Sequence, residues 1–93
     1  MSSIVTTPSF RDWLISRVGL NPRSASDVES RVRRASTLTD ILPGAAEDEV
    51  LLYLGRSPEF CSLSVSVRSQ LRRAVRLFLE YSREMPGHLR LPI

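Results

Sequence analysis

The sequence has no lysine, one cysteine and one histidine, and each scarcity excludes a class of site. The single cysteine, Cys61, cannot form a disulfide within the chain or supply a cysteine-based zinc site. The single histidine, His88, argues against a histidine-rich metal site or a histidine-based catalytic triad. Because a Gly-rich phosphate loop is also missing, we expect a non-enzymatic protein that needs no metal or cofactor.

Long apolar runs are missing too. None approaches the ~20 residues of a membrane span, and the first residues lack the basic start and apolar stretch of a secretory leader. We therefore expect a cytoplasmic protein with no membrane partner. Hydrophobic residues make up 42% and charged residues 25% of the sequence, which is typical of a folded domain. The 93 residues suffice for one domain with one modest core, so a single domain is expected over 1–93.

Two helices are expected in the first half of the chain. Thr7-Pro8 has the form of a cap followed by proline, and Gly19 stops the pattern that follows, which predicts a helix over 8–18. Its apolar residues are spaced three and four apart: Phe10, Trp13, Leu14 and Val18. A second helix is expected to begin at a cap on Ser24 or Ser26. Its inner stripe consists of Val28, Val32 and Ala35.

Two further helices are expected in the second half. An acidic first turn over 47–49 and a stop at Gly55 predict the third helix, and its nearly continuous apolar run over 50–54 predicts burial on most sides. Residues 55–64 are expected to form a loop. The fourth and longest helix should run from Ser64 or Ser66 to Glu84. With 1–7 as a flexible N-terminus and 86–93 as an extended tail, the predicted fold is all-α, a small orthogonal bundle of four to five helices.

The net charge of +3 conceals a segregation along the chain. Residues 1–39 carry six arginines against three acids, residues 40–60 one against five, and residues 61–93 six against two. On the longest helix Arg68, Arg72 and Arg76 follow one another at four-residue steps, and no acid lies four residues before any of them. Like charges at this spacing repel each other. The row therefore suggests an external anion, unless acids of the third helix neutralise it.

The second helix is basic as well, and its arginines lie off the apolar stripe. Two basic helices in one domain suit the phosphate backbone of duplex DNA, because arginine binds phosphate oxygens and guanine edges through its planar fork. We expect phosphate contacts from eight residues on the two helices: Arg31, Arg33, Arg34, Arg68, Arg72, Arg73, Arg76 and Arg83.

The order of these features resembles a known family. Phe10-Arg11-Asp12-Trp13-Leu14, then Gly19-Leu20-Asn21 and Ser24 with the helix after it, are similar to the opening of the core-binding domain of tyrosine recombinases, the SAM-like N-terminal module of phage integrases. The segment from Ser64 to Tyr81, with the stretch from Val75 to Tyr81 in it, resembles the final helix of that domain. Val28 and Ala35 replace two residues that are normally aromatic in the family, and the recombinase catalytic domain is absent from these residues.

The resemblance implies a stand-alone helical module, nucleoid-associated in the cell, whose second and fourth helices approach duplex DNA. Tyr53 and Tyr81 are then core residues rather than nucleophiles. An alternative use of the same fold is a protein-interaction adaptor or small regulatory protein. Its arginines would meet an acidic protein partner, or the acidic segment around Glu47 would meet a basic one. Its apolar tail over 89–93 would dock on another chain.

Other individual residues are expected to be structural. Trp13 should belong to the core, and Cys61 should be a small buried or loop residue because no second thiol or nearby histidine activates it. Asp27 and Glu29, like the acids over 47–49, are in the first turns of helices, where caps and the helix dipole account for them.

Overall fold

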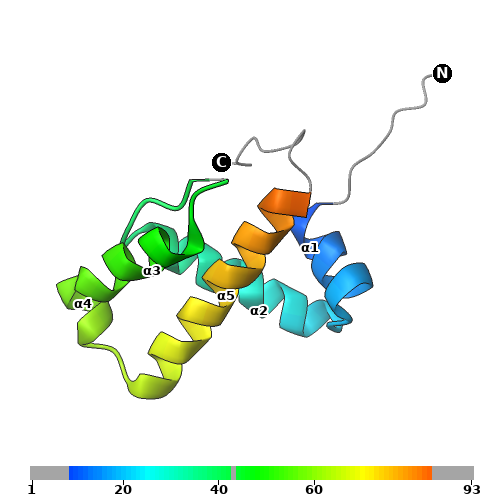
Figure 1. The fold of residues 1–93 in the computed structure, drawn as a ribbon. Coiled ribbons are helices and arrows are strands. Elements are labelled where there is room, and N and C mark those ends of the chain that lie inside the picture. The colour runs from blue at the N-terminus through cyan, green and yellow to red at the C-terminus, as the bar shows by residue number, and fades with distance from the viewer. Residues whose placement is uncertain (1–8, 43, 85–93) are drawn as a thin grey trace.

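The computed structural model describes residues 9–42 and 44–84, and every regular element within them is helical. The expected flexible N-terminus and extended tail, with His88, lie outside these residues. In Figure 1 the two long helices, α2 (Pro22–Ser36) and α5 (Val65–Glu84), cross at the centre of the molecule. On one side lies α1 (Phe10–Trp13), continued by the π-helix η1 (Leu14–Val18), and on the other lie α3 (Glu47–Arg56) and α4 (Pro58–Cys61). The all-α bundle is thus confirmed, and no helix in the described part is long and apolar enough to span a membrane.

The first helical segment begins later than its proline suggests. Ser9, not Thr7, caps α1, because its hydroxyl accepts from the backbone N–H of Asp12 at 3.1 Å. The end is as predicted: Gly19 adopts the left-handed conformation with φ 88°, and the N–H of Leu20 donates to the carbonyl of Leu14 at 3.1 Å. A glycine tolerates this positive φ without strain, which is why the chain turns here.

The predicted start of α2 at Ser24 or Ser26 is wrong. Asn21 is the cap, and its side-chain oxygen accepts from the N–H of Ser24 at 2.8 Å, with Pro22 in the first turn. Proline suits this position because the first helical N–H groups have no intrahelical partner. The inner stripe is confirmed: Val28 and Ala35 are buried and Val32 is partly buried.

The expected loop over 55–64 contains a helix. Helix α3 continues past Gly55 to Arg56, and Ser57 then caps the short α4, accepting from the N–H of Phe60 at 3.3 Å. This places Phe60, 1% exposed, in the core. Cys61 lies on α4 and is exposed, so the expectation of a small buried or loop residue is wrong.

Two apolar clusters lie on the two sides of the α2–α5 crossing, and the larger one joins the two long helices to α3 and α4. It contains Ala35, Ile41, Val50, Leu54, Phe60, Leu71, Val75, Phe78 and Leu79. The smaller cluster joins the same two helices to α1 and η1 through Trp13, Leu14, Ala25, Val28 and Ala74. Trp13 is 1% exposed, as expected of a core residue.

One buried serine fixes the approach of α3 to α5. The Ser82 hydroxyl donates to the carbonyl of Leu79 at 2.8 Å and accepts from the N–H of Gly44 at 3.2 Å. Gly44, with φ 79°, lies in the connection between α2 and α3. The hydroxyl satisfies its own hydrogen-bonding needs while holding this connection against the end of α5.

Candidate nucleic-acid interface

The arginine row of α5 lies along the edge of the helix that faces α3 and α4. Projected at about 100° per residue, Val75 and Leu79 turn toward the larger apolar cluster, and the row of Arg68, Arg72 and Arg76 lies beside them. The opposite edge, which carries Ala74 and Leu77, packs toward α1 and η1. The row is therefore at a boundary between helices rather than at the centre of the solvent face.

Two arginines of this row contact other helices, and the third has a buried Nε. Arg76 Nε lies 3.4 Å from Glu47 Oε2 of α3, and the Arg72 guanidinium lies 5.2 Å from the centroid of the Phe60 ring on α4. The Nε of Arg68 is buried without a hydrogen-bond partner. At Arg76 the alternative that the sequence left open applies, because an acid of the third helix, Glu47, neutralises the charge.

The two remaining α5 arginines of the predicted set point outward. Arg73 lies about 170° from the centre of the buried face and is exposed, and Arg83 is exposed near the end of the helix. Within the described residues neither forms an ion pair with a carboxylate. These two side chains can reach an external anion without breaking a contact of the fold.

The three arginines of the predicted set on α2 lie in the half of the helix that leads toward α3. Arg33 and Arg34 are exposed and Arg31 is half-buried, while the Arg33 Nη2 donates to the hydroxyl of Ser30 at 3.2 Å. In the last turn of a helix positive charge also interacts favourably with the dipole. That interaction leaves most guanidinium N–H donors available for a ligand.

The structure does not bring the eight predicted residues to one surface. Helices α2 and α5 pack against each other, and in Figure 1 α5 passes in front of α2. Because two packed helices turn their contact faces inward, their outer faces point in opposite directions. Arg33 and Arg34 of α2 therefore lie on the side of the molecule opposite Arg73 of α5.

Exposed arginine and hydroxyl groups also gather on α2 alone. We use the term α2 outer face for Arg23, Ser30, Arg33 and Arg34 with the C-cap residue Thr37, which are all exposed away from the core; one exposed acid, Asp27, lies beside them. Sequence reasoning missed Arg23 because it placed the cap three or five residues too late, at Ser24 or Ser26 instead of Asn21. Asparagine before proline is the signature of a helix start that would have revealed Arg23.

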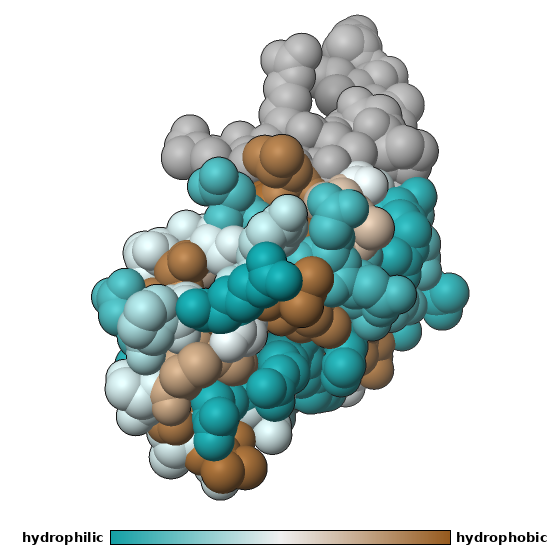
Figure 2. Space-filling view, turned by 60° about the vertical axis from the view of Figure 1, so that its left-hand side comes forward, coloured by the Kyte–Doolittle hydropathy of each residue, from teal (hydrophilic) through white to brown (hydrophobic). Residues whose placement is uncertain are grey.

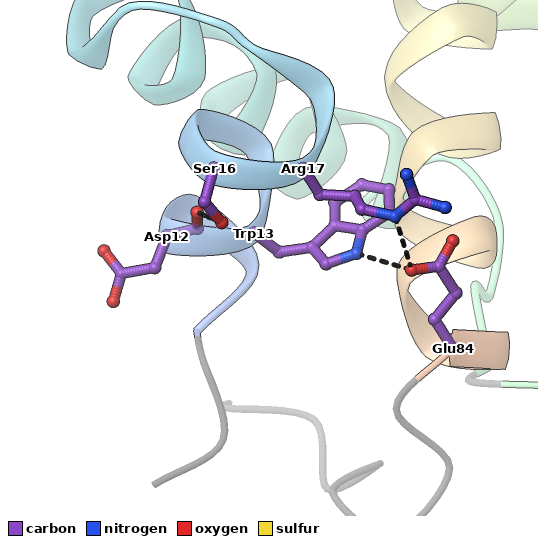
Figure 3. Close-up of polar contacts among 5 residues, drawn as sticks. All are labelled: Asp12, Trp13, Ser16, Arg17 and Glu84. Atoms are coloured by element: carbon purple, nitrogen blue, oxygen red, sulfur yellow. Dashed lines mark hydrogen bonds and ion pairs between the residues drawn. The ribbon is translucent and has the colours of Figure 1, made fainter.

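A second polar cluster joins the N-terminal segment to the end of α5 (Figure 3). The indole N–H of Trp13 donates to Glu84 Oε1 at 3.0 Å, and Arg17 Nε lies 3.3 Å from the same oxygen. The Trp13 hydrogen bond, supported by the Arg17 charge, lowers the pKa of Glu84 below its ordinary value of 4.5. These contacts are internal to the fold, so they stabilise it rather than present a ligand site.

The described residues offer little for catalysis or metal binding. They contain no group of three or more His, Cys, Asp or Glu side chains placed to hold a metal ion. The Cys61 Sγ lies 3.2 Å from the carbonyl oxygen of Gly55, to which it donates. Tyr81 packs in an aromatic cluster with Phe10, Trp13 and Phe78, where burial raises the pKa of its hydroxyl.

Comparison with known proteins finds no counterpart: no family model matches the chain, and no curated protein or solved structure matches it either.

Proposed function

We propose that the chain is a non-catalytic helical module that binds duplex DNA through the α2 outer face. The observation that carries this proposal is the composition of that face: arginine and hydroxyl residues are exposed there with one acid, Asp27, beside them, and no described helix covers them. Arginine, serine and threonine are among the side chains that most often contact phosphate oxygens. Helix α2 has four arginines against two acids, Asp27 and Glu29.

The dimensions of the helix also suit the ligand. A helix of 15 residues is about 22 Å long, and a duplex presents one phosphate charge per about 1.7 Å of its axis. The side chains of Arg23 and Arg34 are separated by three helical turns on the same face. They can therefore contact phosphates on both sides of a major groove while the residues between them face the groove.

The resemblance to the core-binding domain of tyrosine recombinases also supports α2 as the DNA-contacting helix, since the family's second helix approaches DNA. We propose DNA contacts from one helix, whereas the resemblance implies contacts from two. The proposal leaves out the α5 row because Arg76 contacts Glu47 of α3, Arg72 contacts Phe60 of α4, and the Nε of Arg68 is buried.

The test is duplex binding as a function of salt. With three to four phosphate contacts, log affinity should fall against log salt with a slope of about −3. Replacing Arg33 and Arg34 with glutamate should reduce the magnitude of this slope by about 2, because each removes one phosphate contact. The matched control is the double substitution Arg73→Glu and Arg83→Glu, which changes the net charge equally but lies on α5.

The control should keep the slope of the unchanged protein. Equal losses in both double variants would mean that net charge, not the α2 outer face, governs binding. A folded protein that fails to bind duplex at 50 mM salt would overturn the proposal.

The second candidate is a protein-interaction adaptor. The observation that favours it is the outer side of α3, where Leu52 and Tyr53 are 53% and 52% exposed. Sequence reasoning predicted burial on most sides of this helix and a core position for Tyr53. The structure contradicts both, because only one side of α3 contacts the bundle.

A further inference from the structure

Helix α3 has a second amphipathic stripe that points away from the core. We use the term α3 stripe for Glu49 and the residues three, four and seven positions after it, Leu52, Tyr53 and Arg56, which are all exposed. Figure 2 turns the α3–α4 side of the molecule toward the viewer, and hydrophobic residues emerge there among hydrophilic ones. The core side of the same helix is formed by Val50 and Leu54, 4% and 0% exposed.

The two charges of the α3 stripe have no partner of opposite sign within the described residues. The ion pairs found there join Arg17 to Glu84 and Arg76 to Glu47. Glu49 and Arg56 are separated by about 10 Å along the helix axis, which is too far for them to pair with each other. The Arg56 guanidinium lies 5.9 Å from the centroid of the Tyr53 ring, where it keeps its N–H donors for a carboxylate.

We propose that the α3 stripe is the contact surface for a second copy of this chain. The stripe is self-complementary about the point midway between Leu52 and Tyr53. When two α3 helices pair antiparallel across a two-fold axis at that point, Glu49 of each copy faces Arg56 of the other. The leucine and tyrosine side chains of both copies then cover one another at the centre. A two-fold interface requires this reciprocity of unlike residues.

The size of the stripe determines how strong the contact is. Helix α3 has ten residues and is about 15 Å long, so the paired helices bury much less than the roughly 800 Å² per partner of a standard stable interface. The contact is therefore transient, and we expect association only at high protein concentration. Salt weakens it, because part of the attraction is between exposed charges.

This inference rests on the interaction-module candidate and is independent of DNA binding. The α2 outer face and the α3 stripe belong to different helices and share no residue. A chain that stays monomeric and still binds duplex therefore overturns the self-association proposal alone.

The test is sedimentation equilibrium of the full chain from about 10 μM to 1 mM in 50 mM salt. The unchanged protein should rise from its monomer mass of 10.5 kDa toward twice that value. Glu49→Arg and Arg56→Glu should each remain monomeric, because every reciprocal pair becomes a pair of like charges. An equimolar mixture of these two variants should associate again, since each copy then supplies the charge that the other has lost.

Two control variants match the charge changes away from the α3 stripe. Glu80→Arg reverses an exposed acid on α5, and Arg73→Glu reverses an exposed arginine on the same helix; both should associate like the unchanged protein. Circular dichroism establishes that each variant is folded. A monomer at 1 mM would overturn the proposal, as would single charge variants that associate normally or a mixture that fails to recover.

Discussion

On the α1–η1 side the bundle packs around Trp13, which is 1% exposed and whose indole N–H donates to Glu84. On the α3–α4 side the bundle packs around Phe60, and it leaves Leu52 and Tyr53 more than half exposed. The first side joins a buried ring to a polar contact between the two ends of the described chain. The second side relies on apolar packing bordered by the arginine row of α5.

The difference shows how one small bundle divides its surface. On the α1–η1 side the large apolar side chains are used inside the fold, so that side contributes stability. On the α3–α4 side the same helix that packs through Leu54 presents Leu52 to solvent, and this is where we propose a contact surface. Three predictions test this difference between the two sides of the bundle.

The largest effect is expected from Trp13→Ala. Removing a buried aromatic side chain costs about 3–5 kcal/mol in the free energy of unfolding, through lost transfer energy and the cavity that remains. Since a small domain has only about 5–15 kcal/mol in total, this variant should be close to unfolding. Urea unfolding followed by circular dichroism measures the change, with Trp13→Phe as a milder variant. A loss below about 1 kcal/mol would contradict the central position of Trp13.

The two faces of α3 should respond differently to the same substitution. Leu54→Ala should cost about 2–5 kcal/mol, because the side chain is fully buried. Leu52→Ala should change the stability of the monomer by no more than about 0.5 kcal/mol, because the side chain is 53% exposed. The same urea experiment at about 10 μM protein, far below the expected dimerisation range, compares them. Similar losses in both variants would contradict the orientation of α3.

The smallest effect is expected from Glu84→Gln, and it should depend on pH. Because the folded protein lowers the pKa of Glu84 below 4.5, the ionised carboxylate stabilises the fold above that pH. This stabilisation is lost as the pH falls through the lowered pKa of Glu84. The variant should therefore be less stable than the unchanged protein at pH 7, and the gap should shrink below pH 4.5.

Glu80→Gln is the matched control for this measurement. Glu80 lies on the same helix, is exposed, and forms no ion pair within the described residues. Its substitution should leave the stability difference nearly constant over the same pH range. A constant difference for Glu84→Gln would mean that its carboxylate is not held by Trp13 and Arg17.

The helices with long apolar repeats could be predicted from the sequence because their spacing repeats over several turns. The expected start at Ser64 and end at Glu84 agree with α5. Helix starts marked by only two residues were harder to predict. Asn21-Pro22 and Ser57-Pro58 each fit two interpretations, because such a pair can end the preceding helix and can also begin a new one. A local pattern that fits two structures cannot decide between them, and this ambiguity hid Arg23 and α4.

The candidate site was less predictable than the fold because it depends on how the helices cross. The apolar run of α3 contains no polar break that marks Leu52 as the outer residue, so only packing against α5 decides its exposure. The pairing of Arg76 with Glu47 likewise joins two helices that the sequence separates. Whether the arginines of α2 and α5 share a surface is set by the crossing, and the crossing separates them.

The contact between Trp13 and Glu84 also provides an optical reporter. Trp13 is the single tryptophan of the sequence, so the intrinsic fluorescence of the protein comes mainly from the junction between α1 and the end of α5. Loosening of that junction should shift the emission to longer wavelength as water reaches the indole. Pairing through α3 takes place on the other side of the bundle and should leave the emission unchanged, so the two processes can be followed separately in one sample.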